Sequence, residues 1–409
     1  MQSLYNLQEQ ICHQDSLNNN KDKEENIPVI IDAIRSPITK AFKGGLSKLG
    51  PEQILSELLK SLILRNKFLL NNEKLLDEII IGNALQKIGG FINSRSAQIL
   101  SSIPNTVPLY TVNRLCNSGL QAIINANNSI ISGDNKVVIA GGIESMSFNN
   151  FHKMLDEKQL SDDTIILNNP QIKNLLMPMG ITNENICKKY KISRIEQDNF
   201  AFNSHLKAYK ASNITKFFDN EIININNCYK DDCIRNNISK EKLSKLKPVF
   251  IKNGTGTAGN SSPLSDGGAL CLIVSSSILK KYNISNNKIL GKIKGYASIG
   301  VPPEIMGIGP SVAIPLLLKK NNLNIKDIDF FEINEAFAGQ AIYSIKKLKL
   351  PEEKVNVNGG AIAIGHPLGC TGARLVVTML NLLKSYNKKR GIVSMCVGTG
   401  MGCAALIER

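Results

Sequence analysis

The sequence predicts an α/β protein built of two similar halves, and three observations support this. The 409 residues are too many for one ordinary domain and suggest two or three. Short apolar runs alternate with segments of helical periodicity, which is the order expected of a sheet covered by helices. A succession of strand, glycine-bearing turn, apolar helix and closing strand then recurs more faintly from Lys288 onward. We therefore expect two α/β halves packed together.

The elements of the first half follow one another from Pro28 onward. Apolar runs of four or five residues predict strands, and apolar residues recurring every three or four positions predict helices. The predicted strands are 29–33, 78–81, 108–112 and 137–140, the last ending at Gly141 and Gly142, with a later strand at 270–274; the predicted helices are 53–64, 94–101 and one from 120 to about 132.

The segment from about 148 to 247 breaks this rhythm. It is polar and rich in asparagine and lysine, with short helices only around 196–211, and we interpret it as an inserted loop domain. The second half has predicted strands at 328–333, 355–358 and 392–395, and a helix from Ala373 toward Leu383. The expected domains are an N-terminal segment 1–26, an N-terminal half of 27–147 and 248–287, the loop domain 148–247, and a C-terminal half 288–409.

A cysteine stands where a predicted strand turns into a helix. Cys116 follows the strand at 108–112, and the helix after it ends at Gly133, a stop signal. A thiol at this joint faces unpaired backbone N–H groups and the positive end of the helix dipole, which favour the thiolate. Cys116 is therefore a candidate nucleophile, although free cysteine is also among the residue types most often buried in a core.

Two glycine-rich stretches near the C-terminus carry further reactive residues. The sequence NGGAIAIGHPLG places His366 in a glycine loop ahead of an apolar helix, and CVGTGMG places Cys396 after a strand-like run. Glycines let the backbone approach a ligand closely, and histidine is the usual proton shuttle near neutral pH. Either stretch alone is equally well explained by turns or a core histidine. Together with Cys116 they predict a catalytic site.

These stretches belong to an ordered set of motifs through which the chain resembles the thiolases, and most of all the peroxisomal-type 3-ketoacyl-CoA thiolases. The matching segments run from about Ile27 to the C-terminus. In the family's order and spacing they are VNRLCNSGLQA, AGGIESMS, PMGITNEN, LKPVF, TAGNSSPLSDG, VPPEIMGIGP, FEINEAFAGQ, GGAIAIGHPLGCTGAR and SMCVGTGMG. The resemblance implies the thiolase fold, in which two similar α/β halves pack as α-β-α-β-α layers with an inserted loop domain.

The resemblance implies CoA-dependent cleavage of a 3-ketoacyl-CoA to acetyl-CoA and a shortened acyl-CoA, as in fatty acid β-oxidation. Cys116 would hold the shortened acyl chain as a thioester, and Cys396 would protonate the departing acetyl-CoA enolate. His366 would support thiolate formation and, with Asn334 fixing a water, donate to the thioester oxygen. The backbone N–H groups of Cys116 and Gly398 would form a second oxyanion hole.

Several other positions have a structural as well as a functional interpretation. Asn334 by itself is better explained as a helix cap before Glu335, and the resemblance at FEINEAFAGQ reverses this preference. For Glu335 a supporting structural role is expected. By resemblance, Met179, Ala258 and Ser262 line the channel for the pantetheine arm of coenzyme A. Ser262 is equally a turn residue beside a proline.

Two alternative functions remain beside the degradative thiolase. A biosynthetic acetoacetyl-CoA thiolase usually carries a histidine where Pro178 stands here, so this position favours the degradative branch. A non-catalytic, thiolase-like lipid carrier should lack one of Cys116, His366 and Cys396, and this chain has all three. A condensing ketoacyl synthase would use one cysteine and two histidines, whereas here Cys396 takes the second position.

The amino-acid composition limits the classes of partner that we expect. The formal net charge of +15 (49 basic against 34 acidic residues) favours an anionic ligand such as the phosphates of coenzyme A. The lysines are scattered, with no basic stripe or aromatic platform, so no nucleic acid is expected. The nine cysteines form no CxxC pair, which predicts neither a metal site nor a disulfide framework. We expect coenzyme A as co-substrate, no permanently bound cofactor, no membrane span, and by resemblance a homodimer or homotetramer.

The N-terminal segment is polar, is expected to be disordered, and has the spacing of a peroxisomal import signal with one departure. Ser3 and Leu4, five further residues, and then Gln10 and Ile11 fit the nonapeptide that peroxisomal thiolases commonly carry, except that Ser3 replaces the basic residue. The segment has no arginine, which argues against a mitochondrial transit peptide. The expected localisation is peroxisomal, with cytoplasmic and mitochondrial alternatives.

Overall fold

The computed structural model describes residues 26–70, 72, 75–85, 90–149 and 168–409, and the predicted import signal lies outside them. The described residues form two sheets. The first holds β1 (Pro28–Arg35), β2 (Thr39–Lys40), β3 (Glu78–Gly82), β4 (Leu109–Val112), β5 (Val137–Ser145) and β6 (Ser265–Ser275); the second holds β7 (Lys292–Gly300), β8 (Phe330–Ile333), β9 (Arg390–Val397) and β10 (Met401–Glu408).

The two sheets share a mixed topology. The six-stranded sheet has the order β1-β6-β5-β3-β4, with β2 paired to β6, and the four-stranded sheet has the order β7-β10-β9-β8. In the first, β3 is parallel to β4 and β5, while β6 is antiparallel to β5 and β1. In the second, β8 is parallel to β9, and β10 is antiparallel to both neighbours. Each half thus joins a parallel part to an antiparallel one.

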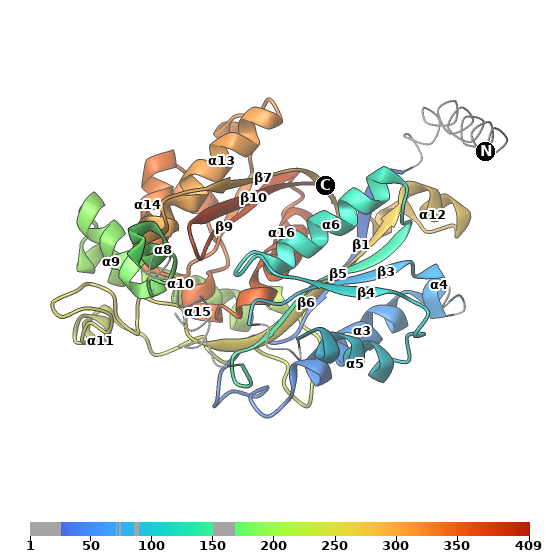
Figure 1. The fold of residues 1–409 in the computed structure, drawn as a ribbon, viewed down its shortest axis with the longest axis horizontal. Helices are drawn as coiled ribbons and strands as arrows, with labels where there is room; N and C mark the ends of the chain where they lie inside the picture. The colour runs from blue at the N-terminus through green and yellow to red at the C-terminus, as the bar shows by residue number, and fades with distance from the viewer. Residues whose placement is uncertain (1–25, 71, 73–74, 86–89, 150–167) are drawn as a thin grey trace.

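The helices form three layers around these sheets (Figure 1). Helices α3 and α5 cover the outer face of the six-stranded sheet, α6 and α16 lie between the sheets, and α13 and α14 cover the four-stranded sheet. This α-β-α-β-α order confirms the predicted fold class. The helices are α3 (Pro51–Arg65), α4 (Lys67–Leu70), α5 (Gly90–Leu100), α6 (Ser118–Ser132), α8 (Pro170–Leu175), α9 (Met179–Tyr190), α10 (Arg194–Tyr209), α11 (Lys240–Ser244), α12 (Ser276–Lys281), α13 (Gly309–Lys320), α14 (Ala338–Leu348), α15 (Ala361–Ile364) and α16 (Leu368–Ser385). No helix in the described ranges is long and apolar enough to cross a bilayer.

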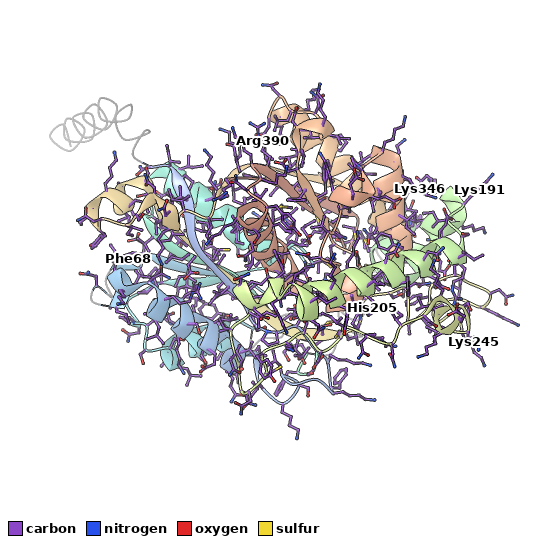
Figure 2. The ribbon with its side chains drawn as sticks, turned by 180° about the vertical axis from the view of Figure 1, so that it is seen from behind. Phe68, Lys191, His205, Lys245, Lys346 and Arg390 are labelled. Carbon is purple, nitrogen blue, oxygen red and sulfur yellow. The ribbon has the colours of Figure 1, made fainter. Side chains whose placement is uncertain are left out.

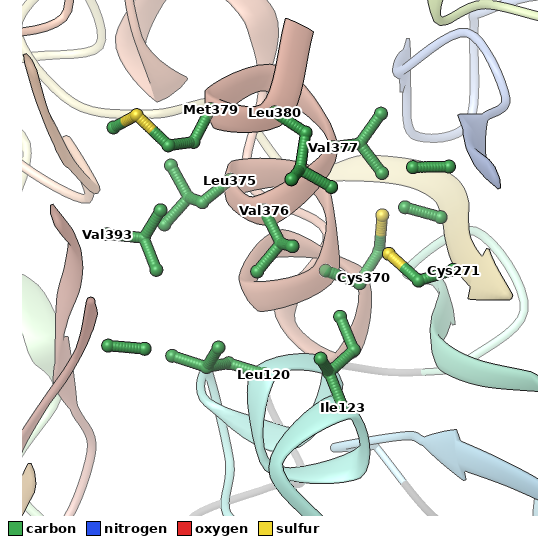
Figure 3. Packing of buried hydrophobic residues seen from close by; sticks show 14 of the residues in the cluster. Leu120, Ile123, Cys271, Cys370, Leu375, Val376, Val377, Met379, Leu380 and Val393 are labelled. Carbon is green, nitrogen blue, oxygen red and sulfur yellow. The ribbon is translucent and has the colours of Figure 1, made fainter. Parts of the chain in front are cut away.

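Helix α16 is the centre of the main hydrophobic core. Its side chains are apolar on nearly every side, as expected of a helix with no solvent-facing stripe. Figure 3 shows Leu375 of this helix among side chains from α6, β6 and β9, which include Leu120, Ile123, Cys271 and Val393. Both sheets and both central helices therefore share one buried cluster.

Glycines bring the central elements into backbone contact. A Cβ atom added to Gly142 of β5 would lie 1.9 Å from the carbonyl oxygen of Gly369, and one added to Gly119 of α6 would lie 2.6 Å from the same oxygen. A Cβ atom on Gly372 would lie 2.5 Å from the backbone nitrogen of Leu120. Real Cβ atoms do not approach other atoms so closely, so α6, α16 and β5 pack in this way only because these positions have no side chain.

Two of the predicted strands differ from the structure. Strand β5 does not end at Gly141 and Gly142 but continues to Ser145, because β3 pairs with it through Gly142 and β6 pairs with it to its end. Residues 355–358 form no strand, and only Val355 makes an isolated bridge, to Phe331.

The side chain of Asn356 explains the second difference. Asn356 has a φ of 44°, in the left-handed region, which ends any extended run. Its side-chain oxygen accepts a hydrogen bond from Ile333 N–H (2.8 Å), and its side-chain nitrogen donates to Ile333 O (2.9 Å). A side chain thus takes the place of a neighbouring strand's backbone. Strands β7 and β10 and helices α13 and α14 were not predicted.

The inserted segment contains a longer helix than predicted. Helix α10 has 16 residues and begins with a capping box formed by Ser193 and Glu196, and Figure 2 shows it crossing the back of the molecule. The segment is tied to the core by Arg35 of β1, which forms a bidentate pair with Asp231 (2.7 and 2.9 Å) and a third bond to Glu221 (2.7 Å). The exact domain boundaries stay a prediction.

The contact at Gly142 makes the first testable prediction. Gly142→Ala should lower the free energy of unfolding by about 3 kcal/mol, the upper part of the range for overpacked cores. Gly300→Ala on β7 is the matched control, because a Cβ atom there meets nothing within 4 Å, and it should change stability by at most about 0.5 kcal/mol. Urea unfolding measures both variants, and equal midpoints would contradict the close packing.

Candidate active site

Cys116 lies in a tight turn between β4 and α6. Leu115, just before it, has a φ of 48°, an unusual left-handed conformation for a leucine. The turn is held by side-chain bonds: the Leu115 N–H donates to Asn113 Oδ1 (2.8 Å), and the Ser118 hydroxyl donates to Leu115 O (2.6 Å). Helix α6 begins at Ser118 and ends at Gly133, which adopts the left-handed capping conformation. The predicted strand-to-helix joint is therefore present.

The protonation state of Cys116 differs from the prediction. Burial raises the pKa of the Cys116 thiol to about 11, although the backbone N–H groups of Gly398 and Cys116 itself act to lower it. The sequence predicts the helix dipole and the N–H groups near the thiol, but it does not show how deeply the thiol is buried. Because removing a charge from water costs more than these dipoles return, the thiol is the resting form.

His366 is buried and held as a neutral ring with one unprotonated nitrogen. Its Nδ1 lies 2.6 Å from Thr371 Oγ1, and the Thr371 hydroxyl donates its only hydrogen to Pro367 O (2.9 Å). Nδ1 must therefore carry the proton, which leaves Nε2 as an acceptor facing Asn334 Nδ2 at 3.3 Å. Burial, and then the charge of Arg374, lower the pKa of His366 to about 3. Thr371 was not predicted, because only the fold brings it next to the ring.

Asn334 and Glu335 occupy different environments. Asn334 follows β8, is fully buried, and has a side-chain oxygen with no hydrogen-bond partner among the described residues. Glu335 accepts hydrogen bonds from Ser204 Oγ (2.6 Å), Asn356 Nδ2 (2.8 Å) and Ile362 N–H (3.3 Å). These bonds join α10 to the loop that precedes His366, which is the supporting geometry expected of Glu335.

Cys396 does not lie in the glycine turn but inside β9, one residue before its end. It is buried, and its pKa is raised, first by burial and then by the neighbouring charge of Cys116. Two thiols from opposite halves of the chain therefore face each other in one dry site.

A cavity of about 450 Å³ joins these side chains. Its lining includes Cys116, His366, Cys396 and Gly398. Asn334 lies behind His366, to which it is hydrogen-bonded. Most of the remaining lining is apolar and comes from the inserted segment, from the stretch that leads into β6 and from the loops after β5, β7 and β8: Met146, Leu176, Pro178, Met179, Val249, Phe250, Ser262, Met306, Ala336 and Phe337. Such a lining suits an acyl chain.

Ala258 lies in a second cavity, of about 210 Å³, which shares Ser261 and Pro263 with the first. Lys40, Arg235 and Lys242 outnumber the single acidic residue Asp232, so the lining of this cavity is basic on balance. Met179 and Ser262 therefore lie with the cysteines and Ala258 does not. The basic residues were not predicted, since Arg235 and Lys242 come from a polar stretch without recognisable periodicity and Lys40 from the short strand β2.

Comparison with known proteins places the chain in a family. The model of the thiolase N-terminal domain matches residues 28–277, and that of the thiolase C-terminal domain matches residues 287–409. The human peroxisomal 3-ketoacyl-CoA thiolase is 44% identical over 400 residues, which cover 93% of this chain and 90% of the relative. The peroxisomal enzyme of Saccharomyces cerevisiae is 44% identical over 385 residues, covering 92% and 90%.

Solved structures agree. The crystal structure of the dimeric peroxisomal thiolase of Saccharomyces cerevisiae has a TM-score of 0.88 and 43% identity, covering 95% of this chain and all of that one. Human mitochondrial 3-ketoacyl-CoA thiolase, solved in complex with CoA, has a TM-score of 0.82 and 35% identity, covering 93% and 97%. The chain belongs to the thiolase family.

His205 in the basic cavity makes the second testable prediction. Its Nδ1 accepts the Arg235 N–H (3.2 Å), and burial, with the Arg235 charge, lowers its pKa to about 4 from 6.5. Between about pH 6.5 and pH 4 the unfolded chain therefore binds a proton at His205 that the folded chain does not bind. The free energy of unfolding therefore decreases as pH falls from about 6.5 to 4. His205→Asn keeps an acceptor but does not titrate. Its unfolding free energy should fall less steeply over this window, by up to about 1.4 kcal/mol per pH unit; parallel curves would contradict the assignment.

Proposed function

We propose that this protein is a 3-ketoacyl-CoA thiolase of fatty acid β-oxidation, which cleaves its substrate with CoA to acetyl-CoA and a shortened acyl-CoA. The observation that carries the proposal is that Cys116, His366 and Cys396, from three separate segments of the chain, line one apolar cavity. The named relatives support the substrate class, since human and yeast enzymes of similar sequence are peroxisomal 3-ketoacyl-CoA thiolases.

The first half-reaction uses the neutral state of the site. The Cys116 proton passes to the free Nε2 of His366, and the sulfur attacks carbon 3 of the ketoacyl group. The bond between carbons 2 and 3 then breaks, its electron pair passes to the acetyl-CoA enolate, and Cys396 protonates carbon 2. The shortened acyl group remains on Cys116 as a thioester, which divides one difficult step into two.

The second half-reaction returns the acyl group to CoA. Cys396, now a thiolate, takes the proton of the incoming CoA thiol, whose sulfur attacks the thioester. The bond between the acyl carbon and the Cys116 sulfur breaks, and this sulfur leaves as a thiolate and takes back its proton from His366. The N–H groups of Cys116 and Gly398 both act on the Cys116 sulfur and are placed to stabilise the oxyanion of this step. Losing one such donor typically costs about 3 kcal/mol of transition-state stabilisation. Asn334 would hold a water beside His366 for the other oxyanion.

The second cavity suits coenzyme A. Lys40, Arg235 and Lys242 would meet its phosphates, and the arm would pass Ser261 toward the cysteines, along a channel that includes Met179 and Ser262. A CoA complex is known for the similar human mitochondrial enzyme. Pro178 at the cavity wall supports the degradative branch over the biosynthetic one.

Localisation and assembly follow the relatives. We infer a peroxisomal protein, as the named relatives are; the signal pattern at Ser3 and Leu4 lies outside the described residues. We also infer a homodimer, because the relative from yeast is dimeric and β4 ends the order of its sheet, so that its outer edge can pair with a second copy. Sedimentation should show a dimer or a pair of dimers, and a stable, active monomer would refute this.

Acylation of Cys116 tests the function directly. With CoA present, 3-ketoacyl-CoA substrates of increasing length should be converted to acetyl-CoA and the shortened acyl-CoA, and the rates should reveal the chain-length preference. Without CoA, the acyl group should remain on the peptide that contains Cys116 after quenching and digestion. Acyl mass found on Cys396 instead of Cys116 would overturn the assignment, and no turnover by the wild-type protein would overturn the function.

The two cysteines should fail in different ways. Cys396→Ala should accept an acyl group from a pre-activated acyl-CoA but not exchange the α protons of acetyl-CoA with deuterated solvent, whereas Cys116→Ala should lose acyl transfer. Each change should cost on the order of 4 kcal/mol or more in the overall reaction, because the residues act as one unit. Mass spectrometry of acetyl-CoA measures the exchange. Wild-type exchange in Cys396→Ala would assign the carbon proton to another group.

A further inference from the structure

A buried carboxylate lies between the histidine loop and the cysteine loop. Glu144 is near the end of β5, is fully buried, and lies outside the described lining of the cysteine cavity. Its Oε2 accepts three backbone hydrogen bonds, from the N–H groups of Gly369 (3.0 Å), Ala84 (3.0 Å) and Leu85 (3.2 Å). One oxygen atom thus binds two segments that are nearly 300 residues apart in the sequence.

The first of these bonds caps the helix that follows the histidine. Helix α16 begins at Leu368, two residues after His366, and its N-cap residue is Pro367, which offers no side-chain cap. The first N–H groups of a helix have no partner within it, and they favour a negative charge. Glu144 supplies the acceptor from a neighbouring strand, and burial raises the pKa of its carboxyl group to about 7 although its backbone hydrogen bonds act to lower it. This bond therefore ties the first turn of α16, which follows His366, to strand β5.

The other bonds lead to the nucleophile. Ala84, whose N–H binds Glu144, accepts a hydrogen bond at its own carbonyl from Asn113 Nδ2 (3.1 Å). Asn113 Oδ1 in turn accepts the N–H of Leu115 (2.8 Å), the left-handed residue directly before Cys116. The path Gly369, Glu144, Ala84, Asn113, Leu115 is thus an unbroken chain of hydrogen bonds and covalent links between the two loops.

The packing of β5 makes this path possible. Gly142 and Glu144 are two positions apart on the strand and so face the same side. A Cβ atom at Gly142 would collide with the carbonyl of Gly369, so the strand and the start of α16 touch at that point. The carboxyl group of Glu144, two positions further along the strand, then accepts the N–H of Gly369.

We propose that Glu144 is a positioning residue for the thiolase reaction, which sets the imidazole of His366 and the thiol of Cys116 in register through the path of hydrogen bonds that passes through Gly369, Ala84 and Asn113. This rests on the proposed function. The residue touches no substrate, so it acts on the rate of the chemical steps and not on binding. A misplacement of about 1 Å at a reacting group costs about 10²-fold in rate.

Two substitutions of Glu144 separate position from charge. Glu144→Ala removes the acceptor, whereas Glu144→Gln retains one oxygen for the same three N–H groups. Both remove the carboxylate charge, which acts on Cys116, so this electrostatic effect is common to the two variants. We expect kcat of Glu144→Ala to fall about 10²-fold relative to Glu144→Gln, with KM for the acyl-CoA unchanged. Equal kcat in the two variants would overturn the proposal.

Asn113 gives a second test that does not disturb the core, since its side chain is exposed. Asn113→Ala should also lower kcat at constant KM, and the double variant with Glu144→Ala should lose no more than the worse single variant, because both interrupt one path. Wild-type kcat in Asn113→Ala, or losses that multiply, would overturn the proposal. Where Glu144→Ala fails to fold, the double variant is built with Glu144→Gln instead, and wild-type kcat in Asn113→Ala still overturns the proposal.

Asp266 provides the matched control. It is a buried carboxylate on the adjacent strand β6, paired opposite Ser145, and it accepts hydrogen bonds from Ser145 Oγ (3.2 Å), Ser147 N–H (2.9 Å) and Ser147 Oγ (2.5 Å). These bonds reach neither the histidine loop nor the cysteine loop. Asp266→Asn should lower the melting temperature while leaving kcat unchanged. A loss of kcat equal to that of Glu144→Ala would show a general effect of buried carboxylates and would overturn the specific role.

A readout that does not require turnover separates this proposal from the proposed function. The rate at which iodoacetamide alkylates Cys116, followed by mass spectrometry of its peptide at constant pH, should be lower in Glu144→Ala than in Glu144→Gln, since a displaced His366 accepts the thiol proton less well. Wild-type protein that is alkylated but does not cleave 3-ketoacyl-CoA would refute the function alone. Equal alkylation rates in the two variants would refute the positioning role.

Discussion

The backbone contact between α6 and α16 is the constraint on which the rest of the structure depends. The two helices lie between the sheets, and each begins directly after a candidate catalytic residue, Cys116 in one case and His366 in the other. Gly119 and Gly372 allow a separation that no side chain would permit. Because both helices are fixed to each other and to β5, their N-terminal ends converge, and the reactive groups of the two halves meet at that end.

Burial sets the chemistry of the site more strongly than any single charge. It raises the pKa of both cysteines and lowers the pKa of His366, so the resting site holds neutral groups. A neutral imidazole with a free Nε2 is the form that can accept a thiol proton, and Thr371 fixes this tautomer. Burial thus destabilises the resting thiolate. It also strengthens the interaction of each fixed N–H group with a charge that develops during the reaction.

The inserted segment is joined to the core by a buried ionic network. Arg35 binds Asp231 and Glu221, and Thr378 of α16 donates to Glu221 (3.2 Å). The network is fully buried, so breaking one partner would leave an uncompensated charge. It therefore fixes the segment that supplies much of the apolar wall of the cavity and the basic residues beside it. The lining of the cavity and the candidate catalytic residues are thereby held in one frame.

The sequence by itself determined the alternation of strands and helices, the helix that follows Cys116 with its end before Gly133, and the three candidate catalytic residues, because these depend on local periodicity, stop signals and residue type. It missed β7, β10, α13 and α14. Tertiary structure decided that 355–358 is not a strand, because the side chain of Asn356 pairs with Ile333 from the left-handed region.

Tertiary structure also decided the ionisation of Cys116 and His366, since burial depends on what packs around a residue and not on its neighbours in the chain. The positions of Glu144 and Arg235 were decided in the same way, because each contacts partners that are distant in the sequence. Local sequence determined which groups could react, and only the packing of distant segments decided where they meet and in which protonation state.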